Sequence, residues 1–172
     1  MGIKSMKELD IDSINSSAPY DVCRDREGAI LFRTDYEVEY SVTFDDDANP
    51  YFTAYWFNLS NMNSRTSPGD PKVAQTVICI IEEFFRKNPD ILLYMCSTVG
   101  GKQAQRSRLF LRWFNGAEQR KYYVSRSIEL RNEEGTTEYV AMIVQRSNPR
   151  LEEILSFFDA EIEMFNDNKP QE

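Results

Sequence analysis

The sequence predicts an α+β fold, in which a mostly antiparallel sheet carries about three helices. Residues 36–44 alternate apolar and polar side chains, as a strand with one buried face does. Residues 71–87 and 151–165 instead place apolar side chains at helical spacing. Two further strand-like runs, 121–130 and 138–145, are joined by a short turn and predict a hairpin.

The first half of the sheet is predicted from three segments. A turn at residues 25–28 precedes a short strand over 29–33, and Thr34-Asp35 turns the chain into the alternating strand 36–44. An acidic turn follows at residues 45–50. Residues 51–59 are apolar on both faces, which predicts a central strand covered on both sides.

The helices are predicted from their ends. Asp70-Pro71 is a favourable start, with Asp as N-cap and Pro at the first helical position, and Asn88-Pro89 ends that helix. A short strand over 91–96 and a second helix over 102–114 follow. Asn148-Pro149 begins the last helix after the hairpin. The predicted order is therefore ββ-β-α-β-α-ββ-α.

The 172 residues are expected to form one domain over residues 20–165, with a loose N-terminal arm at 1–19 and a C-terminal tail at 166–172. No apolar run has the length of a membrane-spanning helix, and acidic residues near the N-terminus argue against a secretion signal. Three cysteines, an odd number, argue against a closed set of disulfides. We therefore expect a reducing cytoplasm and no membrane partner.

Charge is unevenly distributed along the chain. The net charge is −8, from 20 basic and 28 acidic residues. The segment from Gly100 to Arg131 nevertheless has eight basic and two acidic residues, a charge of +6, so the remainder carries −14. Such asymmetry is typical of a face for an anionic partner, and equally of bases that pair with acids inside the fold. The basic residues are Lys102, Arg106, Arg108, Arg112, Arg120, Lys121, Arg126 and Arg131.

The glycine-rich start of the predicted second helix is the candidate binding site. Backbone N–H groups at a helix N-terminus attract anions, and glycines permit close approach. The segment matches neither common nucleotide-binding glycine pattern, so a solvated basic helix start is the simpler interpretation. The candidate anion- or partner-binding residues are Gly100, Gly101, Lys102, Arg106, Arg108 and Arg112.

Arg106 has a separate ambiguity. Helical phase places it on the apolar face formed by Leu109, Phe110 and Trp113. A guanidinium there requires a partner or an open cleft, because an unpaired buried charge is costly. The sequence leaves open a structural ion pair, with Glu82 or Glu83 for example, and a ligand clamp.

Several separated motifs together resemble a small uncharacterised bacterial family that is known only as a domain of unknown function. The resemblance spans roughly residues 20–160, although the family often has glycine where this chain has Glu37. It implies the fold and implies no activity, cofactor or site. The motifs are Phe32-x-Thr34-Asp35-Tyr36-x-Val38-x-Tyr40-x-Val42-x-Phe44, Ile81-Glu82-Glu83-Phe84-Phe85, Leu93-Tyr94, Gly101-Lys102-Gln103, Arg106-x-Arg108-Leu109-Phe110-x-x-Trp113-Phe114 and Asn148-Pro149.

Two hypotheses for the function remain. The chain has no histidine, which excludes Ser-His-Asp triads, Cys-His pairs and histidine-bearing metal sites. We therefore favour a non-enzymatic binding protein without cofactor, whose segment from Gly100 to Arg131 holds another protein or an acidic ligand. Nucleic acid is disfavoured by the pI near 4.7. The alternative is a small acyltransferase-like enzyme that binds a phosphorylated cofactor over residues 100–106.

Overall fold

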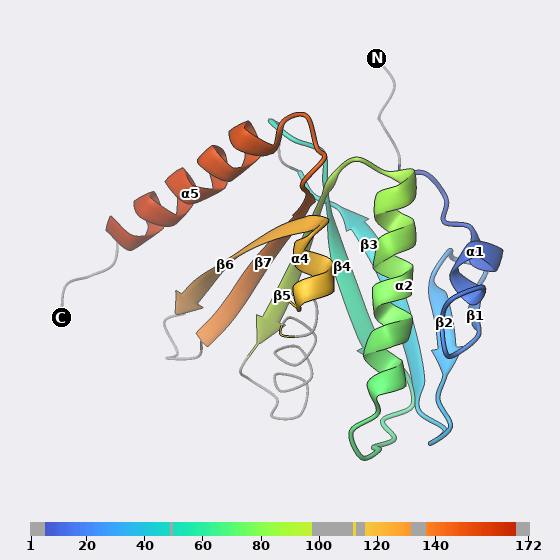
Figure 1. Cartoon of the computed structure of the whole chain (residues 1–172). Helices are drawn as coiled ribbons and strands as arrows, with labels where there is room; N and C mark the ends of the chain where they lie inside the picture. The colour runs from blue at the N-terminus through green and yellow to red at the C-terminus, as the bar shows by residue number, and fades with distance from the viewer. Residues whose placement is uncertain (1–5, 49, 98–111, 113–115, 132–136, 168–172) are drawn as a thin grey trace.

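The computed structural model describes residues 6–48, 50–97, 112, 116–131 and 137–167. Its sheet has seven strands in the order β1-β2-β3-β4-β5-β7-β6 (Figure 1). Only β4 and β5 pair in parallel, so the predicted α+β class with a mostly antiparallel sheet is confirmed. The strands are β1 (Val22–Arg24), β2 (Ile30–Arg33), β3 (Glu39–Asp46), β4 (Ala54–Asn61), β5 (Ile91–Ser97), β6 (Tyr123–Arg131) and β7 (Thr137–Gln145). The described residues form four helices, one more than about three: α1 (Ile11–Asn15), α2 (Pro71–Lys87), α4 (Ala117–Arg120) and α5 (Leu151–Asp167).

The ends of α2 follow the sequence prediction. The Asp70 carboxylate accepts the Lys72 N–H at 3.1 Å, and Pro71 occupies the first turn, where its missing N–H costs nothing. At the other end the Asn88 side chain donates to the Phe84 carbonyl at 3.2 Å. Both ends of the helix are therefore closed by side chains that the sequence alone identified.

β3 begins three residues later than the alternating pattern predicts. Tyr36 and Glu37 belong to the turn, in which the Thr34 hydroxyl accepts the Tyr36 and Val38 N–H groups, each at 3.2 Å. Glu37 has a φ of 61°, the left-handed region that glycine occupies most easily. Its carboxylate lies 2.8 Å from Arg65. The alternation of apolar and polar side chains therefore begins within the turn, before the backbone becomes extended at Glu39.

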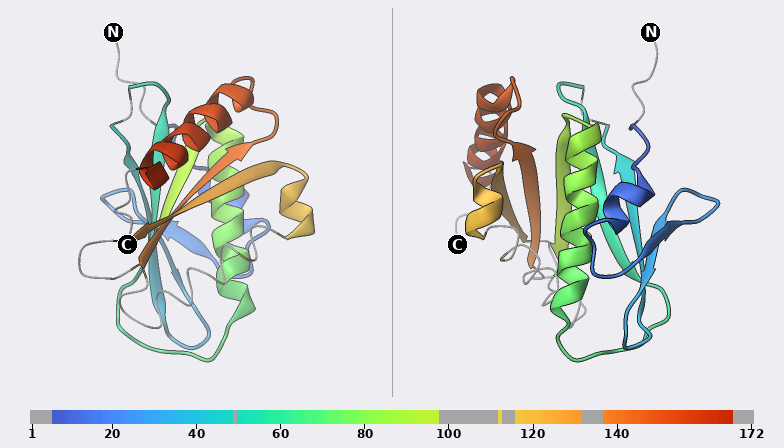
Figure 2. Two further views of the ribbon diagram at one scale, coloured as in Figure 1. Left: turned by 90° about the vertical axis from the view of Figure 1, so that its left-hand side faces the viewer. Right: turned by 45° about the vertical axis from the view of Figure 1, so that its right-hand side comes forward.

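The sheet separates two apolar layers, with α2 on one face and α5 on the other. In the left view of Figure 2, α5 lies in front of the strands and α2 behind them. The two layers follow from the alternation of side chains along a strand, since Tyr55 and Phe57 of β4 pack with α2 whereas Ala54 packs with α5. The α2 layer is the larger, and α2 contributes to it Val77, Ile80, Ile81, Phe84 and Phe85. The α5 layer contains Ala54, Ile91, Val124, Met142, Val144 and Ile154.

The described part of the N-terminal segment, expected to be loose, is packed. Leu9 is 3% exposed and Ile14 of α1 is 1% exposed, so both belong to the core. The buried Glu83 carboxylate of α2 accepts the Asp10 N–H at 3.3 Å, and the Asn88 side chain accepts the Lys7 N–H at 2.8 Å. Polar side chains of α2 thus hold a segment whose own composition resembles that of a linker.

Candidate functional site

Most of the predicted anion site lies outside the described residues. Gly100, Gly101, Lys102, Arg106 and Arg108 fall there, and so does the predicted helix over 102–114 apart from residue 112. The pairing of Arg106 therefore stays a prediction. Arg112 is described, in helical conformation with an exposed side chain. Of the two carboxylates considered for Arg106, Glu83 is bound to Arg86 of its own helix.

The later part of the basic segment forms a corner where α4 meets β6. Arg120, Lys121 and Arg146 are exposed there around Tyr122, which is 64% exposed. Arg146 fixes the corner, because its backbone N–H donates to the Tyr122 carbonyl at 2.8 Å and its Nε donates to the Arg120 carbonyl at 2.5 Å. We call these four residues the basic corner.

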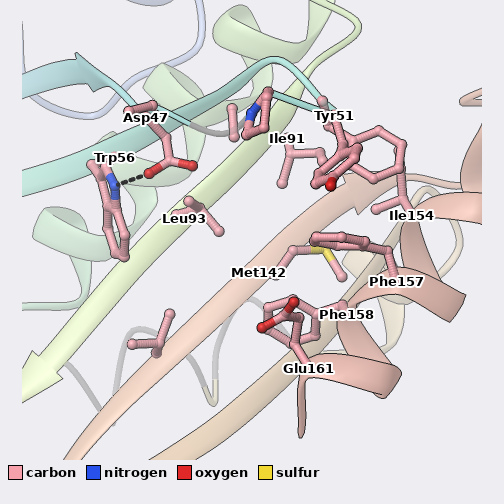
Figure 3. A pocket seen from close by; sticks show the side chains of 15 residues that line it. Asp47, Tyr51, Trp56, Ile91, Leu93, Met142, Ile154, Phe157, Phe158 and Glu161 are labelled. Carbon is pink, nitrogen blue, oxygen red and sulfur yellow. Dashed lines mark hydrogen bonds between the residues drawn. The ribbon is translucent and has the colours of Figure 1, made fainter. Parts of the chain in front are cut away.

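A groove of about 520 Å³ opens between the sheet and α5, on the face opposite α2 (Figure 3). We call it the α5 groove. Its floor is formed by side chains on the α5 face of three adjacent strands, including Ala54 of β4, Leu93 of β5 and Met142 of β7. Its wall is the inner side of α5, with Phe157 and Phe158. The volume falls within the range of small-molecule sites, and the lining is mainly apolar and aromatic, as such sites are.

Aromatic rings and one arginine hold the start of α5 against the chain between β3 and β4. Phe157 lies 5.2 Å from Tyr51 and 5.5 Å from Phe52, measured between ring centroids. The Arg150 guanidinium lies 4.5 Å from the centroid of Phe52 and donates to the Tyr51 carbonyl at 3.4 Å. Arg150 also pairs with Glu153 at 3.1 Å. These contacts join the first half of α5 to the segment between β3 and β4, at one end of the groove.

Two carboxylates from opposite walls face the α5 groove. Asp47, directly after β3, accepts the indole N–H of Trp56 at 3.0 Å, which orients both side chains at the groove (Figure 3). Glu161 projects from α5 at the opposite wall of the groove. Arg126 lies 3.7 Å from Asp159 on the same helix. No ion pair within the described part of the chain includes Asp47 or Glu161.

A second set of titratable groups lies on α2. Burial, with the Glu82 carboxylate nearby, raises the pKa of the Cys79 thiol. Burial also raises the pKa of Glu82 and raises that of Tyr123 to about 12. Perturbed groups can mark a functional site, but a thiol with a raised pKa holds little thiolate and is a poor nucleophile. Cys79 therefore acts as a half-buried core residue.

Sequence reasoning did not identify the α5 groove. A partial signal existed, because residues 51–59 are apolar on both faces and a strand of this kind needs cover on each side. The apolar stripe of the last helix was the matching surface, and Leu151, Ile154, Leu155 and Phe158 do pack in the α5 layer. The side chains of Ile162 and Phe165 in that stripe lie outside the described part.

Within the described residues no group of three Cys, Asp or Glu side chains is arranged to hold a metal ion, and no helix is long and apolar enough to cross a bilayer. The protein is therefore a single-sheet α+β domain with an apolar groove between the sheet and its last helix. The chain belongs to a family of unknown function, DUF6169, whose model matches residues 69–160. This match includes α2, β5 and β7 and ends within α5, and it confirms the resemblance to an uncharacterised family. Neither a curated protein nor a solved structure matches the chain.

Proposed function

We propose that the protein is a non-enzymatic binding protein of the cytoplasm and that the α5 groove is its ligand site. The observation that carries this proposal is the groove itself, about 520 Å³ of largely apolar space between a sheet and a helix. Burial of an apolar ligand group there removes apolar surface from water at about 25 cal/mol per Å². The aromatic wall and floor belong to packed elements, so little ordering is needed on binding.

Binding of N-phenyl-1-naphthylamine, a neutral dye that fluoresces in apolar surroundings, tests this proposal. Phe157→Ala removes an aromatic wall of the groove, and the matched control Tyr36→Ala removes a 48% exposed aromatic side chain from the turn before β3, which does not line the groove. We expect Phe157→Ala to weaken dye binding about tenfold, equivalent to about 1.4 kcal/mol, and Tyr36→Ala to leave it unchanged. Equal affinities in all three proteins, each shown to be folded by circular dichroism, would refute the proposal.

The basic corner supports a second function, the one that the charge distribution favoured. Arg120, Lys121 and Arg146 are exposed near Tyr122, and Glu118 pairs with Lys121 at 3.3 Å, so two of the three positive charges have no acidic partner among the described ion pairs. This local positive charge favours an acidic protein or ligand. A polyglutamate peptide is a suitable probe. Its binding should weaken as salt rises and should weaken again in an Arg120→Gln/Arg146→Gln variant. Binding that is independent of both would remove this candidate.

The enzyme alternative rests on residues 100–106 and stays a prediction. A thermal-shift measurement with coenzyme A and ATP tests it directly. A rise in the melting temperature at millimolar ligand, lost in Lys102→Gln, would support it, and no rise with either ligand would remove it.

A further inference from the structure

The charges of the α5 groove specify which ligand it takes, given that the groove is the ligand site proposed above. Asp47 and Glu161 approach the same apolar space from opposite walls (Figure 3). Asp47 is half-buried, and the hydrogen bond from Trp56 occupies one of its oxygens. A carboxylate beside an apolar surface loses hydration when a ligand covers it, and this cost is offset only by a donor or a positive charge.

No Arg or Lys is among the described residues that line the groove, and two arginines that contact α5 or directly precede it have partners elsewhere. Arg150 pairs with Glu153 at 3.1 Å and lies over the Phe52 ring, and Arg126 lies 3.7 Å from Asp159. Within the described residues, neither forms an ion pair with Asp47 or Glu161. An anionic ligand would therefore meet two negative charges, whereas a cationic ligand would meet two complementary ones.

The aromatic lining favours the same charge. The faces of Trp, Tyr and Phe rings attract cations electrostatically, and Trp does so most strongly. Trp56, Tyr51 and Phe157 all line the groove. Phe52, another lining residue, already has the Arg150 guanidinium 4.5 Å from its ring centroid, although Arg150 itself does not line the groove. A positive group on a ligand would thus find a carboxylate and aromatic ring faces in the same groove.

We infer that the α5 groove binds a small amphiphilic cation, that is, an apolar chain or ring that ends in one ammonium or guanidinium group. The apolar body lies on the floor formed by Leu93 and Met142, and the positive group lies at one of the two carboxylates, Asp47 or Glu161, which stand at opposite ends of that floor (Figure 3). The concave shape and the volume of about 520 Å³ fit a single small molecule rather than the flat surface of a protein.

Three probes with the same eight-carbon chain separate the charge from the apolar contact. Octylammonium, octanol and octanoate are each titrated against protein loaded with N-phenyl-1-naphthylamine at constant salt, and displacement of the dye gives the affinity. We expect octylammonium to bind at least tenfold more tightly than octanol, and octanoate to bind most weakly. Glu161→Gln and Asp47→Asn should each reduce the preference for octylammonium over octanol severalfold, because each amide keeps the side-chain size and removes the charge.

Glu152→Gln is the matched control, since it neutralises an exposed acid of α5 that does not line the groove. It should leave all three affinities unchanged. Equal affinities for octylammonium and octanol would overturn the inferred charge preference and leave the groove as an apolar site. Displacement of the dye by none of the three probes would overturn the inference and count against the proposed function as well. A preference for octanoate would contradict the inference directly.

Discussion

Ile154→Ala should weaken the attachment of α5, the wall of the α5 groove, to the sheet. Ile154 is 4% exposed, lines the groove and packs in the α5 layer with Ile91, Val124 and Met142. The substitution removes three carbons, worth about 0.8 kcal/mol each, or roughly 2–3 kcal/mol in total. Water can enter the vacated space from the open groove, so the penalty for an empty cavity is small and this value is at the low end for such substitutions in cores.

Native-state hydrogen exchange of the α5 amides measures this effect locally. A loss of roughly 2.4 kcal/mol corresponds to about 50-fold faster exchange through local opening, while the amides of α2 should change much less. Glu152→Ala, at an exposed position of α5, is the control and should change exchange very little. Identical protection of α5 in Ile154→Ala and Glu152→Ala would refute the reasoning, because Ile154 would then not hold the helix on the sheet.

Three further outcomes follow from the structure. Glu37→Gly should give a protein about 1 kcal/mol more stable than Glu37→Ala in urea unfolding, because the φ of 61° favours glycine and both variants lose the carboxylate. Burial and the hydrogen bond to Asp70 raise the pKa of Tyr20 to about 12 from 10.0, so the stability that Tyr20 contributes is complete below pH 10 and is lost as pH rises towards 12. Tyr20→Phe should therefore show a smaller loss of stability between pH 10 and 12 in thermal unfolding. With Cys96 replaced by Ser, the exposed Cys23 should react with Ellman's reagent at least tenfold faster than Cys79, whose thiol pKa is raised by burial. Equal rates at the two thiols would contradict the burial of Cys79.

The elements with strong local signals could be predicted from the sequence. The Asp70-Pro71 start and the Asn88 end of α2 depend on side chains within four residues of the helix termini, and these contacts are present. The central place of β4 followed from its apolar character on both faces. β1, α1 and α4 were not predicted, because three to five residues are too few to establish a periodicity. β2 is equally short, and it was identified by the turn at residues 25–28 that precedes it. α1 depends instead on contacts from distant residues, such as that of Glu83 with Asp10.

The candidate site could not be predicted, since its parts are distant in the chain. Asp47 and Glu161 are 114 positions apart in the sequence, and their place on one groove depends on the strand order β4-β5-β7 and on the face of the sheet that α5 covers. No local pattern encodes that strand order. The basic segment from Gly100 to Arg131, by contrast, is easily found in the sequence because its basic residues lie close together along the chain. Closeness along the chain does not show that the same residues form one site in the folded protein.

The most direct test of the central claim is the position of bound octylammonium on the protein. With methyl-labelled protein, intermolecular nuclear Overhauser effects report which methyl groups lie within a few ångströms of the octyl chain. We predict effects at the Met142 and Ile154 methyls, which line the α5 groove, and none at the Val77 and Ile80 methyls, which lie in the α2 layer. Effects confined to methyls of the α2 layer, or none at Met142 and Ile154 at saturating octylammonium, would contradict the claim that the α5 groove is the ligand site.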